Sequence, residues 1–475
     1  MSTLPAYARD RGALWAALMG GVLLGVAVAL DGGTDHHWSL ALRNFELFTM
    51  PPFGVVLSVV GLALLLSWAI PHAATVWRAR HMVAIGIVLF CSHLMGLGLG
   101  VLNPILFAIL LFFAVWLLDR LRNPQAAFHP TAFTFLVLGF CALALISTLG
   151  IPPKEILIGL LSAAPKLLLA LLLADVLDTP EKVRRAMSLM LWAAALFSLV
   201  GIVQATLFYF FGIEFSLAAA DYRYAHTPFG SLLRATGLAR FANQYAPPLV
   251  VAALMAVTLL ASPAGKGHRL RLAALLVVTV AAVGLSIVRG AWTGLAIGLL
   301  VVPFVLRPDR SRIWAGALLG LVVLAFATGV GPWLVRSMSG LSESSLIERR
   351  SLLIAGLNVM FAHPLKGVGI LNFGQYSPAI ERHPVHNAFV QAGSELGIPA
   401  LVLYVAIFLY VAAGLLRAMR TVSDRAVRAQ LAAVLVGLLG LGILMQGEPM
   451  AYAQFVWIYL ALGAAASRVA LAGRA

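Results

Sequence analysis

Apolar runs of about 17 residues or more recur along almost the whole chain, separated by short polar segments. A run of this length crosses the hydrocarbon core of a bilayer as a helix, which satisfies its own backbone hydrogen-bonding groups. Hydrophobic residues make up 61% of the 475 residues and charged residues only 11%, a balance that excludes a water-soluble globular protein. The sequence therefore predicts an all-α, polytopic membrane protein.

The runs predict about 12 to 14 transmembrane helices. The predicted spans are 12–30, 53–70, 82–98, 101–118, 131–149, 156–177, 185–211, 246–261, 270–287, 290–306, 313–331, 399–416, 429–445 and 452–470. The pair around Gly98 to Asn103 also fits one broken helix, and Pro165 interrupts the sixth span. No small-residue cleavage site follows the first span, so we do not interpret it as a signal peptide.

Basic residues orient these spans. If the N-terminus is cytoplasmic, about 21 of the 33 Lys and Arg residues fall in the inside loops, which are also short. We therefore predict that both termini lie in the cytoplasm. The formal net charge of +15 is then a sign of membrane topology, and we expect no nucleic-acid partner.

Cysteine and acidic residues show no pattern of a metal or cofactor site. Cys91 and Cys141 lie inside apolar runs, so neither a disulfide framework nor a thiolate metal site is indicated. The chain has no Asp-x-Asp pair, and the carboxylates of the long outside loop are not spaced as metal ligands. We therefore expect no metal and no cofactor. These carboxylates are Glu343, Glu348, Glu381 and Glu395.

Three predicted outside loops carry the polar candidates for function. The loops at about 212–245 and 332–398, with a tight turn between two spans, place Arg234, Arg289 and His386 on one face of the membrane. A guanidinium group matches a phosphate or diphosphate through two parallel hydrogen bonds, and an arginine at membrane depth is costly without such a partner or a polar cavity. We therefore predict an anion site at this face. The alternative for each arginine is contact with lipid headgroups.

The stretch RHPVHNAFVQAGSELGIPA, residues 382–400, is the polar end of the long outside loop. Pro384, Asn387 and Gly397 predict the start, the cap and the stop of a short helix, with His386 in its first turn. The positive end of the helix dipole favours a neutral imidazole there, which can accept a proton. His386 is therefore the candidate general base, and the alternative is a histidine that only closes the loop.

The rest of the long loop predicts a further helix above the outer mouth of the bundle. Ser345 and Glu348 form a capping-box pattern before an amphipathic helix that ends ahead of His363, and KGVGILNFG follows as a glycine-rich turn. Basic residues of this loop are accessory candidates for anion contacts, with solvated helix charge as the alternative. A lysine inside the sixth span needs a polar cavity or an anionic partner. The accessory candidates are Arg349, Arg350, Lys366, Asn387 and Lys166.

Four segments resemble, in order and spacing, the signatures of the bacterial O-antigen ligase and polymerase superfamily. They read RATGLARFANQYA, SIVRGAW, ERRSLLIAGLNVMFAHPLKGVGILNFG and HNAFVQAGSELGIPALVLY, and the similarity extends from about residue 80 to the C-terminus. The resemblance implies a multi-span fold of the glycosyltransferase C type, with a helical periplasmic loop before the last three spans. The implied domains are an added N-terminal transmembrane pair (1–80), a transmembrane core (81–331), a periplasmic catalytic loop (332–398) and C-terminal transmembrane helices (399–475).

The resemblance further implies an enzyme that moves a glycan from undecaprenyl diphosphate to an acceptor sugar hydroxyl. The reaction takes place at the periplasmic face of the bacterial inner membrane, among membrane lipids. His386 corresponds to the motif histidine that activates the acceptor, and Arg234 and Arg289 to the motif arginines that engage the donor diphosphate. The family's usual Ser before the second arginine is Val288 here, and its usual Asn-Pro-Asn is Ala-Asn-Gln at 242–244, which bears on substrate specificity.

Two acceptors fit this chemistry. Ligation to a lipid A core and polymerisation of a growing glycan use the same reaction, and we favour ligation while the sequence leaves both open. A single base with direct displacement at the anomeric carbon predicts inversion of configuration, whereas retention needs a carboxylate nucleophile. Glu395 more readily braces the loop helix than attacks. A lipid or solute transporter is a further alternative, but no paired broken spans occur in two matching halves.

Overall fold

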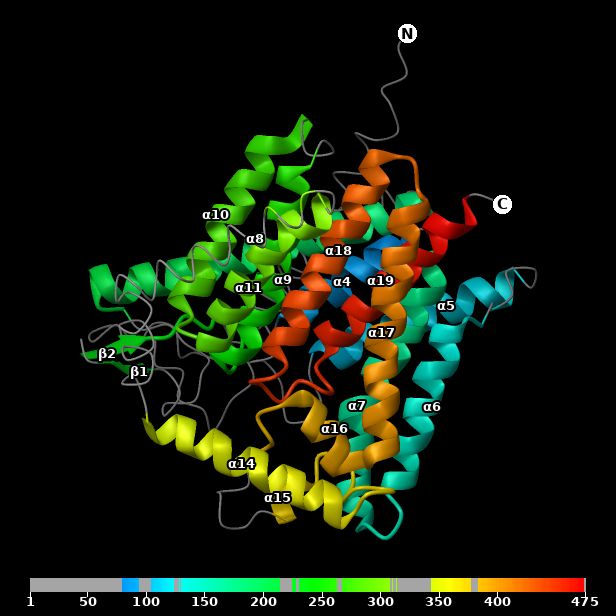
Figure 1. Cartoon of the computed structure of the whole chain (residues 1–475), viewed down its shortest axis with the longest axis vertical. Helices are drawn as coiled ribbons and strands as arrows, with labels where there is room; N and C mark the ends of the chain where they lie inside the picture. The colour runs from blue at the N-terminus through cyan, green and yellow to red at the C-terminus, as the bar shows by residue number, and fades with distance from the viewer. Residues whose placement is uncertain are drawn as a thin grey trace, which may run out of the picture.

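The computed structural model describes residues 79–93, 104–123, 128, 130–213, 224–227, 230–262, 267–307, 310, 313, 343–376 and 383–473. These residues are helical apart from one two-stranded hairpin and the connections between elements. Eight of the described helices are long and apolar enough to cross a membrane. The prediction of an all-α, polytopic membrane protein is thus confirmed (Figure 1).

The first group of helices runs from residue 80 to residue 211. It consists of α4 (Arg80–Cys91), α5 (Pro104–Arg122), α6 (Ala132–Ser147), α7 (Pro153–Val176) and α8 (Pro180–Phe211). Thr131 caps α6 by accepting from the N–H of Thr134, and Thr179 caps α8 by accepting from the N–H of Lys182. α7 continues through Pro165, so the predicted interruption of this span is wrong. A proline removes one helical hydrogen bond, and packing against neighbouring helices makes this tolerable in a membrane.

The second group begins with a hairpin. β1 (Tyr224–Thr227) pairs antiparallel with β2 (Gly230–Leu233). It is followed by α9 (Ala242–Ala261), α10 (Arg269–Leu285) and α11 (Arg289–Leu306). Only Ser286, Ile287 and Val288 separate α10 from α11, which confirms the predicted tight turn.

The last group contains three short or peripheral helices and then three long ones. They are α14 (Glu343–Ala362), α15 (Phe373–Tyr376), α16 (Ala388–Leu396), α17 (Ile398–Thr421), α18 (Arg425–Leu444) and α19 (Gln454–Ala472). α14 ends ahead of His363 as predicted, but it begins at Glu343. Ser345 is therefore inside the first turn of α14, and the prediction that it caps this helix is wrong because the helix begins three residues earlier than a cap at Ser345 would allow.

The core of the bundle is formed by α9, α18 and α19. α9 packs against α10, α11 and α18, and α19 packs against α7 and α17. The fully buried rings of Phe140, Tyr404 and Trp457 join α6, α17 and α19, with centroids 5.4 to 5.8 Å apart. Large apolar side chains such as Phe107 and Phe135 are exposed on the outer helices, as expected for a surface that faces lipid.

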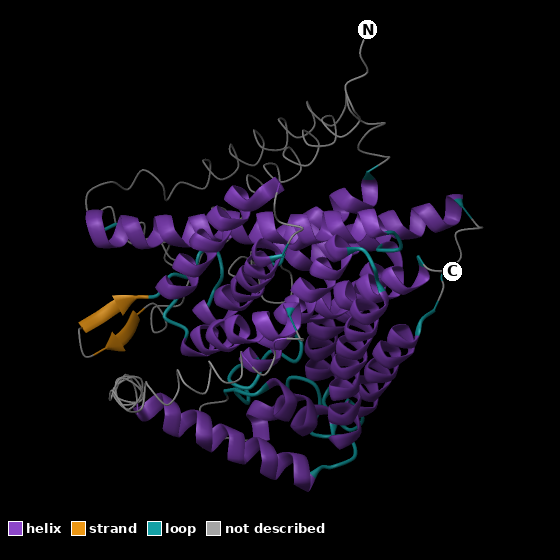
Figure 2. Ribbon diagram, turned by 45° about the horizontal axis from the view of Figure 1, so that its top comes forward, coloured by secondary structure: helices purple, strands orange, loops and turns teal. Residues whose placement is uncertain are grey.

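One end of the bundle carries the extramembrane helices. Figures 1 and 2 show α14, α15 and α16 lying across the end of the bundle from which α17 starts. α16 packs against α14, α17 and α6. We call this end the loop face; it is defined by α14–α16 and by the α10–α11 and α18–α19 connections.

Every predicted span that falls fully within the described residues overlaps a helix. The predictions at 12–30, 53–70 and, apart from residue 313, 313–331 lie outside the described residues, as does the choice between one and two helices around Gly98 to Asn103. The division of the chain into four domains stays a prediction.

Candidate active site

His386 lies directly before the start of α16. The side chain of Asn387 accepts hydrogen bonds from the N–H groups of Phe389 and Val390, both at 3.0 Å, so Asn387 is the N-cap. Gly397 ends the helix with a φ of 91°, as predicted. His386 therefore precedes the cap, and its predicted place in the first helical turn is wrong by two positions, because the cap residue itself is not yet helical.

The start of α16 is tied to the α18–α19 connection. The Asn387 side-chain amide donates to the backbone oxygen and to the side-chain oxygen of Gln446, both at 3.2 Å. The N–H of Ala388 donates to the backbone oxygen of Met445 at 2.9 Å. These contacts hold His386 against residues 446–451, so two segments far apart in the sequence form one wall of the site.

Glu448, in the α18–α19 connection, is the buried carboxylate of this wall. One of its oxygens accepts from the Asn243 amide at 2.9 Å and lies 3.7 Å from Nδ1 of His386, an ion-pair distance. Its other oxygen accepts from Arg349 at 3.2 Å. Glu448 is only 1% exposed. Burial raises the pKa of Glu448, but contacts with His386, Arg349 and Asn243 outweigh burial and hold this pKa below its ordinary value of 4.5, so the group is ionised at neutral pH.

Sequence reasoning missed Glu448. We considered carboxylates only in the long outside loop, and Glu448 lies in the short stretch QGEPMAY between the last two spans. The sequence signal that could have identified Glu448 is its position in a short polar segment between two apolar spans. An ionisable residue at such a position is a candidate for function.

Three arginines lie near one another at this wall, and two of them, Arg349 and Arg234, interact with Glu448. Arg349, on α14, donates to the backbone oxygen of Gly447 at 2.8 Å and to Glu448. Nε of Arg234 donates to the backbone oxygen of Ser286 at 3.4 Å, next to the turn that leads into Arg289, the first residue of α11. Burial lowers the pKa of Arg234; Glu448 opposes this effect, whereas the like charges of Arg349 and Arg289 add to it. The predicted residues Arg234 and Arg289 are thus near one another and near Arg349.

The backbone around Arg234 is held by a buried glutamine of α8. The side-chain oxygen of Gln204 accepts from the N–H groups of Thr236, at 2.8 Å, and Gly237, at 3.0 Å. Gly237 has a φ of 54°, a conformation that favours glycine. The N–H of Ala235 donates to the backbone oxygen of Leu285 at 2.9 Å, which fixes Arg234 beside the α10–α11 turn.

Polar atoms in this region remain unpaired. The side-chain oxygens of Asn243 and Gln244, together with Nδ1 of His386, are buried without a hydrogen-bond partner among the described residues. Buried polar atoms are normally paired, and each exception calls for an explanation. A ligand with several hydrogen-bond donors would pair with the two amide oxygens.

Glu395, a buried residue of α16, links the elements that support the site. The N–H of Leu371 donates to the Glu395 carboxylate at 2.8 Å, and the side chains of Tyr452 and Gln391 lie close enough to lower its pKa. Leu371 has a φ of 57°, so the carboxylate holds a turn whose backbone is strained. Burial raises the pKa of Glu395 to about 7. Glu395 thus joins the glycine-rich turn, α16 and the α18–α19 connection.

The other accessory candidates lie elsewhere. Arg350 is exposed on α14, and Lys366 donates to the backbone oxygen of Leu149, two residues beyond the end of α6. Lys166 lies inside α7, next to Pro165. None of these three has a contact with His386 or Glu448 that the structure records among the described residues, so only Arg349 and Asn387 of the accessory set join the site.

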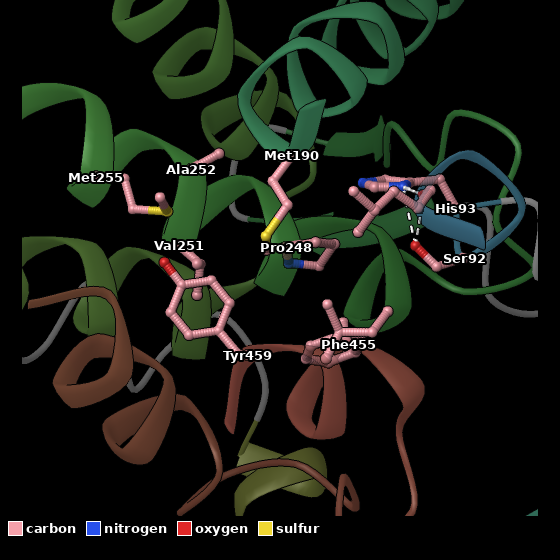
Figure 3. A pocket seen from close by; sticks show the side chains of 11 residues that line it. Ser92, His93, Met190, Pro248, Val251, Ala252, Met255, Phe455 and Tyr459 are labelled. Atoms are coloured by element: carbon pink, nitrogen blue, oxygen red, sulfur yellow. Dashed lines mark hydrogen bonds between the residues drawn. The ribbon is translucent and has the colours of Figure 1, made fainter. Parts of the chain in front are cut away.

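A small cavity inside the bundle is separate from this site. It has a volume of about 20 Å³ and lies among α4, α8, α9 and α19, with His93 and Tyr459 in an otherwise mostly apolar wall (Figure 3). The His93 ring stacks on Phe197, with centroids 4.4 Å apart, and its Nδ1 lies 2.9 Å from the backbone oxygen of Leu89. The cavity has room for about one water molecule and none for a sugar.

Metal ligands are not grouped in the described part of the chain. No three His, Cys, Asp or Glu side chains among those residues are arranged to hold a metal ion. The cations recorded around Glu448 are the arginines, and their charge is what a phosphate group would meet there.

Comparison with known protein families finds a match for one segment of the chain. Residues 272–405 match the family model for O-antigen ligase. The match includes Arg289, Arg349 and His386, and ends before Glu448. No curated protein matches the chain.

Proposed function

We propose that this chain is a lipid-linked oligosaccharide glycosyltransferase. The family-model match at residues 272–405 supports its membership of the O-antigen ligase and polymerase superfamily. This enzyme moves a glycan from undecaprenyl diphosphate to an acceptor sugar hydroxyl, and the favoured acceptor is a lipid A core. The loop face is then the periplasmic face of the bacterial inner membrane, and both termini are cytoplasmic. The charge distribution of the sequence supports this orientation.

The observation that carries the proposal is the pair of His386 and Glu448 beside a group of arginines. A sugar hydroxyl is a poor nucleophile, and a histidine can take its proton as the new bond forms. With Nδ1 turned towards Glu448, Nε2 of His386 is the nitrogen available to the acceptor hydroxyl. The carboxylate orients the ring and stabilises the imidazolium that proton transfer creates, as the aspartate does in a Ser-His-Asp triad.

The arginines provide for the donor. The bond from the anomeric carbon to the diphosphate breaks, and negative charge grows on the departing lipid diphosphate. Arg234 and Arg289 are the residues we assign to this diphosphate, because both lie beside the α10–α11 turn and are close enough for their charges to interact. Arg349 is held by Glu448 and by Gly447, which suits a role in organising the site more than in direct donor binding.

Direct displacement with one base predicts inversion at the anomeric carbon. A retaining reaction needs a carboxylate that attacks this carbon. Glu448 is occupied by Asn243 and Arg349, and Glu395 by Leu371, so neither is free for attack.

The test is transfer by the purified protein in lipid nanodiscs. An undecaprenyl diphosphate-linked glycan is supplied with a lipid A core or with a second lipid-linked glycan as the acceptor, and products are identified by mass spectrometry. The proposal expects an inverted linkage to the lipid A core. Elongation of the lipid-linked glycan alone would identify a polymerase, and absence of transfer to either acceptor would overturn the enzymatic assignment.

A further inference from the structure

A second cavity lies at the end of the bundle opposite the loop face. It has a volume of about 320 Å³. It is lined by the N-terminal end of α6 and by the C-terminal parts of α7, α17 and α19. α17 begins beside α16 and α19 begins beside the Glu448 connection, so both helices end away from the active site. In the proposed orientation this cavity lies in the cytoplasmic half of the membrane.

The polarity of the cavity changes along the helices. Arg417 lines it four residues before the end of α17, and Arg468 four residues before the end of α19. Deeper in the bundle the walls are Tyr410, Ala413 and alanines of α19. Since a helix rises 1.5 Å per residue, Tyr410 is about 10 Å further from the helix end than Arg417. Two cations at the rim and apolar walls below match a molecule with an anionic head and an apolar tail.

The two arginines differ in their partners. Arg468 donates to the backbone oxygens of Ala174, at 2.7 Å, and Leu177, at 3.3 Å, at the end of α7, so it is fixed in place. The guanidinium of Arg417 forms no hydrogen bond or ion pair with the described residues that the structure records, and it is exposed. Gly414 allows α17 to approach α19 closely at this level, because a Cβ there would lie 2.9 Å from the Ser467 hydroxyl oxygen. The cavity is thus formed by elements in firm contact.

We propose that this cavity binds a phospholipid with an anionic headgroup, its phosphate between Arg417 and Arg468 and the start of an acyl chain along Tyr410 and Ala413. Basic pockets between transmembrane helices near the membrane surface are suited to anionic headgroups. The occupant comes from the membrane that surrounds the bundle. This site is independent of glycan transfer, since it lies at the other end of α17 and α19, and its test does not use enzymatic activity.

The test is lipid retention by the full-length protein, measured by native mass spectrometry. Phosphatidylglycerol, which is anionic, and phosphatidylcholine, which is zwitterionic, are added in equal amounts to delipidated protein. The variants are Arg417→Gln, which removes the exposed cation, and Ala413→Phe, which fills the apolar part and keeps both arginines. Arg420→Gln is the matched control, because Arg420 is exposed on the same helix and does not line the cavity.

The wild-type protein and Arg420→Gln should retain phosphatidylglycerol in preference to phosphatidylcholine. Arg417→Gln should weaken phosphatidylglycerol binding roughly fivefold, the effect of one basic residue near a membrane surface. Ala413→Phe should reduce retention of both lipids. Equal retention of the two lipids by the wild type, or the same loss in Arg417→Gln and Arg420→Gln, would overturn the proposal, because the binding would then reflect only general surface charge. If Arg417→Gln does not fold, the Ala413→Phe result and the wild-type preference still decide.

Discussion

Replacing Glu448 with Gln should slow glycan transfer about 100-fold while leaving donor binding intact. The substitution keeps the shape of the side chain but removes a charge 3.7 Å from Nδ1 of His386. At this separation and an effective dielectric constant of about 20, the interaction with an imidazolium is on the order of 4 kcal/mol. His386 is 18% exposed, so solvent screens part of this energy. If roughly 3 kcal/mol remains, the expected loss in kcat is about 100-fold.

The assay compares kcat with donor affinity in three proteins. Wild type and Glu448→Gln are tested at saturating donor and acceptor, and donor binding is measured separately by photo-crosslinking. Glu348→Gln is the control, because Glu348 also lies near a histidine, 3.9 Å from His383, but is 44% exposed. The control should keep its kcat, since an exposed ion pair contributes little.

The reasoning would be refuted if Glu448→Gln kept its kcat within twofold of the wild type. It would also fail if donor binding and kcat fell in parallel, because Glu448 would then hold the arginines in place without assisting proton transfer. A carboxylate that only opposed the negative donor would give a third result, tighter donor binding with unchanged kcat.

Three other predictions follow from the structure and the charge pattern. The pKa of Glu395 rises from 4.5 to about 7 on folding, so the native state binds the proton more tightly between these values and the free energy of unfolding should fall as pH rises through this window, by on the order of 3 kcal/mol. The thermal midpoint of the wild type should therefore decrease from pH 5 to pH 8 more steeply than that of Glu395→Gln, and equal slopes would contradict the assignment. Transfer should persist in excess EDTA, and complete loss that magnesium or manganese restores would show that a metal supplies the electrostatics. In a Cys-free background, cysteine at Ser342 should label from outside intact cells and cysteine at Ser423 only after permeabilisation; labelling of Ser423 from outside would reverse the proposed topology.

The helical framework was predictable because a bilayer leaves few options. The apolar lengths alone indicated the helices, and the stops at Gly397 and ahead of His363 follow from local backbone preferences. The tight turn before Arg289 was equally local. These features depend on residues close together in the chain.

Tertiary pairs were harder to predict. The apolar pattern of α18 and α19 gives no information on which distant residues contact the connection between these two helices. The contacts of Glu448 with His386 and Asn243 could therefore not be derived from the sequence. The cap of α16 was predicted correctly at Asn387, but His386 was placed in the first turn of this helix for a related reason. Pro384 and Asn387 both fit a helix start, and only the hydrogen bonds from Phe389 and Val390 to Asn387 distinguish them.

Separation of chemistry from binding at His386 tests the central claim most directly. Donor binding and glycan transfer are measured side by side on the wild type and on His386→Ala at matched expression. If His386 takes the proton of the acceptor, the substitution should lower turnover by about 10² to 10⁴ and leave donor binding nearly unchanged, whereas Arg234→Ala and Arg289→Ala should weaken both. Parallel loss of binding and transfer in His386→Ala, or transfer at the wild-type rate, would contradict the account.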